Sequence, residues 1–136
     1  MYEKDYIMKM IEAFSMMIAK IIGLREKEEL DRAADLIQEA YDTILKINPD
    51  ILQNLDEAEW DKFCSDRTPE ELEMIAELLK LEGEIRIDTG DPEGVCRLLF
   101  KSLELLKIVD AKSNAFSVVR FEKISSLEEK LSGADY

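Results

Sequence analysis

The sequence predicts an all-α protein, and three observations support this fold class. Leu, Ile, Met, Ala, Glu and Lys are abundant, whereas the 136 residues include only five Gly and three Pro. Apolar residues recur every three or four positions through long segments, and no long alternation of apolar and polar residues indicates a strand. Turn residues separate these segments, most clearly at positions 88–92, Asp-Thr-Gly-Asp-Pro. A chain of this length is expected to form one domain around a single core.

The first expected helix covers residues 2–22 and ends at Gly23. Its apolar residues occupy most of its circumference, so it needs neighbouring helices on more than one side. One of its faces carries Ile7, Met10, Phe14, Met17 and Ile21. This face is expected either to pack between the second and fourth helices or to pair with a second copy of the chain, which would make the protein a homodimer.

The second expected helix runs from Leu30 to Ile47, where Asn48 and Pro49 end it, so residues 1–49 form a first helical hairpin. An acidic crossover follows at residues 50–67. It contains a short turn at residues 51–55 and a short helix at residues 56–63. Trp60, the only tryptophan, is expected to be either a buried lid over the second helix or an exposed anchor for a partner.

A capping box marks the start of the fourth expected helix, which continues to Asp88. The Thr68 hydroxyl can accept a hydrogen bond from the Glu71 amide while the Glu71 carboxylate accepts one from the Thr68 amide, and Pro69 suits the first helical position. Two apolar stripes indicate that this helix is flanked on both sides and open along one edge. Gly83 lies mid-helix, where Gly costs about 1 kcal/mol relative to Ala, so we expect the fifth helix to approach closely there.

A tight turn is expected to join the fourth and fifth helices. Gly90 is expected in the left-handed conformation at the end of the fourth helix, Asp91 as the cap of the fifth, and Pro92 as its first residue. Residues 68–110 then form a second hairpin, and residues 111–131 a sixth, capping helix before a frayed tail at 132–136. The predicted architecture is a single domain, residues 1–136, of antiparallel hairpins with five long helices plus a short crossover.

A line of charged residues follows the open edge of the fourth helix. It consists of Glu73, Glu77, Lys80, Glu84 and Asp88, and four of these five are acidic. Such an edge is expected either to be a solvated surface, the usual fate of a charge run, or to line a groove that attracts a Lys/Arg-rich segment of a partner. The same carboxylates could share a divalent ion, but helical di-metal sites commonly add histidine ligands, which this chain lacks.

Composition argues against several functions. The net charge of −13 repels phosphate backbones and anionic lipids, so neither nucleic acid nor a membrane is an expected partner. There is no His and no catalytic, cofactor or metal motif, so no site of these kinds is predicted. Cys64 and Cys96 are isolated and are expected to be ordinary thiols in a reducing compartment. Charged residues interrupt the apolar N-terminal segment, which is therefore expected to be neither a signal peptide nor a membrane span, and a cytoplasmic location is expected.

The second hairpin resembles a tetratricopeptide repeat. Gly83 occupies the small position at which the two helices cross, and Gly90 with Asp91 matches the turn. Residues 101–105 and 36–50 are similar to the end of the second helix of such a repeat. The opening residues 5–11, DYIMKMI, followed by two helical units, also resemble an uncharacterised family of small bacterial proteins with this organisation.

The resemblance implies a right-handed, tetratricopeptide-like stack that acts as a non-catalytic module for binding a protein or peptide. Two alternatives stay open from the sequence. One is a self-associating structural protein that uses the apolar first helix. The other is a small-ligand binder or enzyme that uses the helical core, which would require a deep pocket with convergent polar groups.

Overall fold

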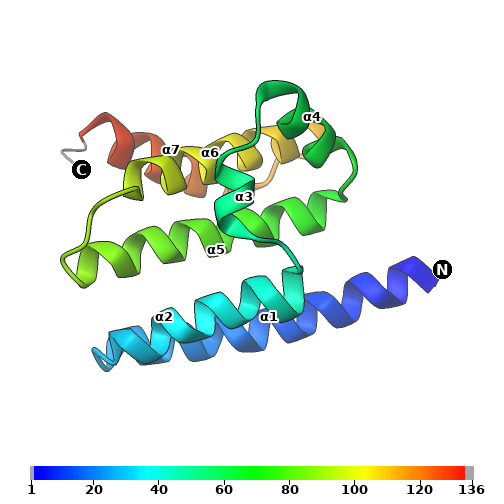
Figure 1. Ribbon diagram of the computed structural model, residues 1–136. Helices are drawn as coiled ribbons and strands as arrows, with labels where there is room; N and C mark the ends of the chain where they lie inside the picture. The colour runs from blue at the N-terminus through cyan, green and yellow to red at the C-terminus, as the bar shows by residue number, and fades with distance from the viewer. Residues whose placement is uncertain (1, 134–136) are drawn as a thin grey trace.

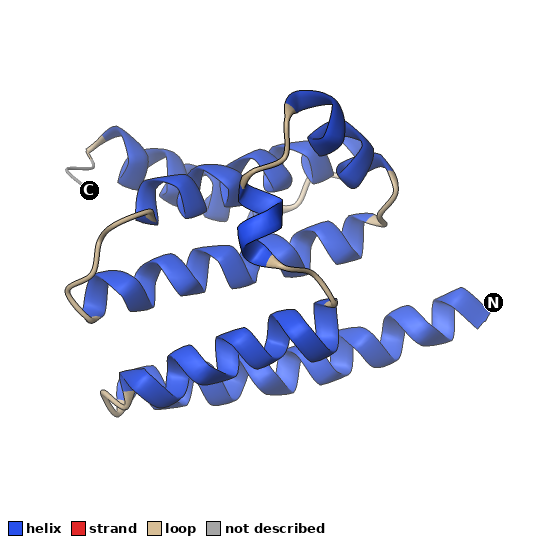
Figure 2. Ribbon diagram, viewed as in Figure 1, coloured by secondary structure: helices blue, strands red, loops and turns tan. Residues whose placement is uncertain are grey.

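The computed structural model describes residues 2–133, and within this range it contains helices and loops but no strand (Figure 2). The elements are α1 (Tyr2–Glu26), α2 (Leu30–Glu39), the π-helical segment η1 (Ala40–Leu45), α3 (Pro49–Gln53), α4 (Glu57–Ser65), α5 (Pro69–Asp88), α6 (Val95–Lys112) and α7 (Val118–Ser132). The all-α prediction is therefore confirmed.

Helix α5 lies at the centre of the fold. Figure 1 shows α1 and α2 side by side below α5, and α6 with α7 above it. The contacts agree with this view, because α5 packs on α6, α1, α2 and η1, and α7 packs on α6. The two apolar stripes predicted for α5 are both buried: they comprise Leu72, Ile75, Ala76 and Leu79, and Met74, Leu78, Leu81 and Ile85. Most of the core is built around this helix.

Helix α6 approaches α5 closely at Gly83, as predicted. A Cβ atom added to Gly83 would lie 3.1 Å from Leu99 Cδ2 and 3.6 Å from Val95 Cγ1, and both of these neighbours belong to α6. Two helical turns before Gly83 on α5, the Ala76 carbonyl accepts a hydrogen bond of 2.7 Å from the Ser102 hydroxyl of α6. The absence of a side chain at Gly83 therefore permits the close approach of Leu99 and Val95.

The capping box at the start of α5 is also confirmed. The Glu71 amide donates to Thr68 Oγ1 at 3.2 Å, and the Thr68 amide donates to Glu71 Oε1 at 3.1 Å. A second box, at the start of α4, joins Asp56 and Glu59 in the same way. These side chains satisfy backbone amides that have no partner within the helix.

The turn between α5 and α6 differs in part from the prediction. Gly90 has φ of 77°, the expected left-handed conformation. Asp91 does not cap α6, however, because the helix begins later and Gly94, which has φ of 78°, directly precedes it. The Asp91 amide instead donates to the Arg86 carbonyl at the end of α5. Two left-handed glycines thus delay the start of α6 from residue 92 to residue 95.

Three other boundaries also differ from the prediction. Helix α1 continues through Gly23 to Glu26, and the reversal occurs at Glu28, which has φ of 60°. The second expected helix changes to π geometry at Ala40–Leu45. The sixth begins at Val118, not at residue 111, because α6 extends to Lys112 and the Ser117 side chain caps a new helix. Of the predicted tail, Ser132 is helical, and residues 134–136 lie outside the described range.

Trp60 is a buried lid, but it covers α6 and not the second helix. It is 6% exposed, its ring stacks on Phe63 with centroids 5.9 Å apart, and Lys101 Nζ of α6 lies 4.0 Å from the ring centroid. The Lys112 ammonium group, also on α6, donates to the Cys64 carbonyl of α4 at 3.3 Å. The crossover containing α3 and α4 therefore packs on the outer side of α6.

Candidate functional site

The charged edge of α5 faces α7. Arg120 Nη1 lies 3.4 Å from Glu73 Oε1, Lys123 Nζ lies 3.2 Å from Glu77 Oε1, and Lys130 Nζ lies 2.8 Å from Glu84 Oε2. These pairings advance together along both helices. Helix α7 therefore runs parallel to α5 and is joined to it by three ion pairs.

Arg25 of α1 pairs with the last two carboxylates of the charged edge of α5. Its Nε donates to Asp88 Oδ2 at 2.6 Å and its Nη1 donates to Glu84 Oε1 at 3.0 Å. The hydrogen bond to Asp88 raises the pKa of the guanidinium group, although partial burial acts in the opposite direction. Glu84 accepts from both Arg25 and Lys130, so this one carboxylate connects α1, α5 and α7.

The line predicted as an acidic groove surface is consequently charge-balanced. All five of its members are in ion pairs with residues of this chain, including Lys80 with Glu77 at 3.9 Å. The four carboxylates are matched by Lys80, Arg25, Arg120, Lys123 and Lys130. The sequence showed these acidic residues on one helix but did not show which basic residues the fold would place beside them. Attraction of a basic segment by this line stays a prediction.

A groove of about 460 Å³ runs along the same edge. Helix α1 supplies one wall with Ile11, Phe14, Ser15, Ile18, Ala19 and Ile22, whereas α5 contributes Glu73, Met74 and Glu77, and α7 contributes Lys123. Ile11 is 36% exposed and Ile22 is 41% exposed. The groove thus combines an apolar wall, open to solvent, with a floor whose charges are paired.

The predicted self-association face lies mainly toward the core, next to the groove wall, and Phe14 belongs to both. Phe14 and Ile21 are buried, and Ile7, Met10 and Met17 are partly buried. This agrees with the intramolecular alternative, because α1 packs against α2, η1 and α5. The whole face could contact a second copy only if α1 separated from these helices. Self-association through α1 stays a prediction.

A buried polar network that was not predicted from the sequence connects η1 to α5. The Tyr41 hydroxyl donates to Glu82 Oε1 at 2.7 Å, and Arg86 Nη2 donates to Glu82 Oε2 at 2.7 Å. Burial, together with the adjacent Glu82 carboxylate, raises the pKa of Tyr41 well above its usual value. One signal was present in the sequence, since Tyr41 and Glu82 are polar residues at positions where their helices are otherwise apolar.

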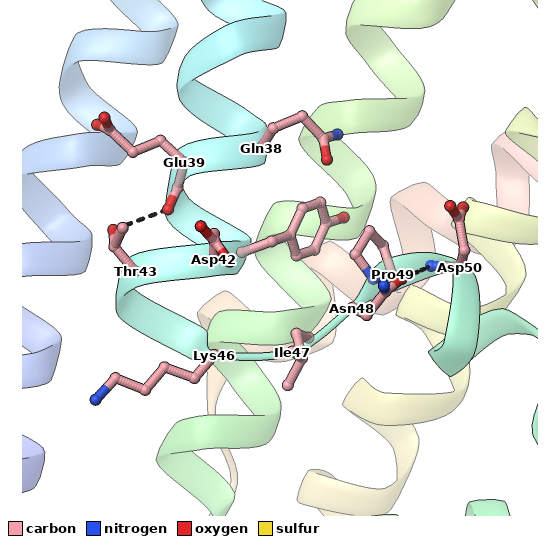
Figure 3. A pocket seen from close by; sticks show the side chains of 10 residues that line it. Gln38, Glu39, Asp42, Thr43, Lys46, Ile47, Asn48, Pro49 and Asp50 are labelled. Carbon is pink, nitrogen blue, oxygen red and sulfur yellow. Dashed lines mark hydrogen bonds between the residues drawn. The ribbon is translucent and has the colours of Figure 1, made fainter.

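A larger hollow, of about 790 Å³, lies between η1 and the start of α3 (Figure 3). In the figure, the side chains of Glu39, Lys46 and Asp50 point in different directions. Two polar groups there already serve the backbone: the Thr43 hydroxyl donates to the Glu39 carbonyl at 2.8 Å, and Asn48 Oδ1 accepts from the Asp50 amide at 2.9 Å. The hollow therefore lacks a convergent set of polar groups.

The cysteines and carboxylates show no reactive arrangement within residues 2–133. Cys64 is buried, which raises the pKa of its thiol, and Cys96 is exposed; neither forms a disulfide. In the described part of the chain, no three His, Cys, Asp or Glu side chains are arranged to hold a metal ion.

Comparisons with family models, with curated proteins and with solved structures found no match to this chain. None of the helices within residues 2–133 has the length and apolar character needed to cross a membrane.

Proposed function

We propose that the protein is a non-catalytic interaction module, organised as a tetratricopeptide-like stack, that binds a segment of another protein in the groove formed by α1, α5 and α7. In such a stack the first helix of each hairpin lines the concave surface. The contacts support this assignment, because α1 packs on α2, α5 packs on both, α6 packs on α5 and α7 packs on α6. The three groove helices then correspond to the first helices of successive units.

The observation that carries this proposal is the exposed apolar wall of α1. Met8, Ile11 and Ile22 are separated by three and eleven residues, which places them on one stripe of the helix. Met8 is 53% exposed, and the two isoleucines are exposed to 36% and 41%. Contiguous exposed apolar residues beside a groove are typical of protein interaction sites.

Affinity capture with three forms of the protein tests the proposal. The wild type is compared with Ile22→Asn, which places a polar group in the groove wall, and with Ile51→Asn, which makes the same change at a residue on α3 that is 63% exposed and outside the groove. A partner that is retained by the wild type and by Ile51→Asn but lost by Ile22→Asn would support the groove as the binding site. Equal retention by all three forms would contradict it.

A further inference from the structure

Helical spacing places three exposed carboxylates next to residues that line the apolar groove, and these carboxylates form no ion pair within the described residues. Glu12 lies on the same stripe of α1 as the groove residues Ser15 and Ala19, at spacings of three and seven. Glu26 continues this stripe four residues after Ile22. Glu70 precedes the groove residues Glu73 and Met74 on α5 by three and four positions. The floor carboxylates are paired, but these three at the rim are not.

The unpaired charges beside the apolar wall are therefore mainly acidic, with three carboxylates against one basic residue. Lys4, seven residues before Ile11, is a basic residue on the same α1 stripe that forms no ion pair within the described chain. Glu12 and Glu26 are fourteen residues apart in the sequence, which corresponds to about 21 Å along a helix. A helix of about four turns laid along α1 would pass both carboxylates.

We propose that the occupant of the groove is an amphipathic helix of a partner protein, with large apolar residues along one stripe and Lys or Arg on its flanks about four turns apart. This inference rests on the proposed function and adds the chemistry of the partner. The apolar stripe covers Ile11, Ile18 and Ile22, and the basic flanks meet Glu12, Glu26 and Glu70. Charge complementarity favours this occupant over a second copy, because each copy carries a net charge of −13 and presents the same acidic rim.

Three synthetic peptides of about eighteen residues test the inference against the full chain. The first is an amphipathic helix of Leu and Lys, with Leu on one stripe and Lys on the flanks. The second replaces each Lys by Glu, and the third keeps the composition of the first but distributes Leu evenly around the helix. Dissociation constants come from fluorescence anisotropy, and the binding site comes from amide chemical-shift changes in ¹⁵N-labelled protein.

The first peptide is expected to bind most tightly and to shift the amides of residues 11–22 and 70–77. Replacing Glu12, Glu26 and Glu70 together by Gln should weaken it about tenfold, since each exposed charge contributes a fraction of a kcal/mol. The matched control Asp31→Asn, Asp35→Asn and Asp42→Asn removes three exposed charges from α2 and η1, outside the groove, and should change the dissociation constant less than about twofold.

The possible failures are distinguishable. If the Leu/Glu peptide binds the groove as tightly as the Leu/Lys peptide, the inference that the partner helix carries basic flanks is wrong, but the groove keeps its proposed role. If no peptide shifts the groove residues, the proposed function fails as well. If light scattering shows a dimer that Ile22→Asn dissociates, the occupant is a second copy and the inference is overturned.

Discussion

Replacing Tyr41 by Phe tests whether the buried network with Glu82 holds α5 against the first hairpin. The substitution keeps the aromatic ring and removes a hydroxyl that donates to Glu82 Oε1 at 2.7 Å. Both residues are buried, with exposures of 1% and 6%. Because a hydrogen bond to a charged acceptor contributes about 1.5–3 kcal/mol, Tyr41→Phe should lower the free energy of unfolding at pH 7 by about that amount.

The stability that Tyr41 contributes should fall at high pH. The pKa of Tyr41 is raised in the folded protein, whereas an unfolded tyrosine titrates near pH ~10. Above that pH the unfolded state binds fewer protons than the folded state, so the stability contributed by Tyr41 falls as pH rises. Between pH 7 and pH 11 the stability contributed by Tyr41 should therefore decrease, whereas the Phe variant has no phenol to titrate at this position. The stability difference between the two proteins should narrow accordingly.

Urea unfolding followed by circular dichroism at pH 7 and pH 11 measures both effects. Tyr6→Phe is the matched control, because Tyr6 is 49% exposed and forms no side-chain hydrogen bond among the described residues. This control should change the free energy of unfolding by less than about 0.5 kcal/mol. If Tyr41→Phe is as stable as the parent at pH 7, or if the difference does not depend on pH, the assigned role of the network is wrong.

Three further predictions concern the packing, the ion pairs and the cap of α5. Gly83→Leu should destabilise the protein by about 1–3 kcal/mol because the new side chain overpacks against Leu99, whereas Gly83→Ala should leave the stability nearly unchanged. An unchanged melting temperature for the Leu variant would contradict the close approach of α5 and α6. Glu84→Gln should lower the free energy of unfolding by about 1–2 kcal/mol at low salt and by less in 1 M NaCl. The control Asp66→Asn, which removes an exposed ion pair, should lower it by less than about 0.5 kcal/mol. Thr68→Ala should cost about 1 kcal/mol in chemical denaturation, and no loss would mean that the capping box is not stabilising.

Features set by residues close in sequence were the ones that could be predicted. The capping box at Thr68 and Glu71 involves residues three positions apart, and the left-handed Gly90 depends on local backbone geometry. The two apolar stripes of α5 follow from helical periodicity. The helix ends were predicted wrongly where two nearby residues could each begin or end the helix. At residues 91–94, for example, both Asp91 and Gly94 could precede α6, and Gly94 does so in the structure.

The candidate site depended on contacts between residues distant in sequence, so the sequence described it only in part. The line from Glu73 to Asp88 lies on one edge of α5, but Arg25 and Lys130 reach that edge from positions separated from Glu84 by 59 and 46 residues. Periodicity on a single helix carries no information about such neighbours. For the same reason, the broad apolar surface of α1 could be recognised, but not which part of it the core would cover.

The long separation between Arg25 and Glu84 also has a consequence during synthesis on the ribosome. Helices α1 and α2 adjoin in the chain and can pair early, but α1 must wait for α5 to be made. With 59 residues between the two partners and translation at about 5–20 residues per second, this delay is about 3–12 s. Throughout this interval Phe14, which lies beside Met74 in the folded protein, lacks the contacts that α5 provides, so the nascent N-terminal hairpin presents an apolar surface suited to chaperone binding. Crosslinking to stalled nascent chains should therefore decrease once α5 has left the exit tunnel.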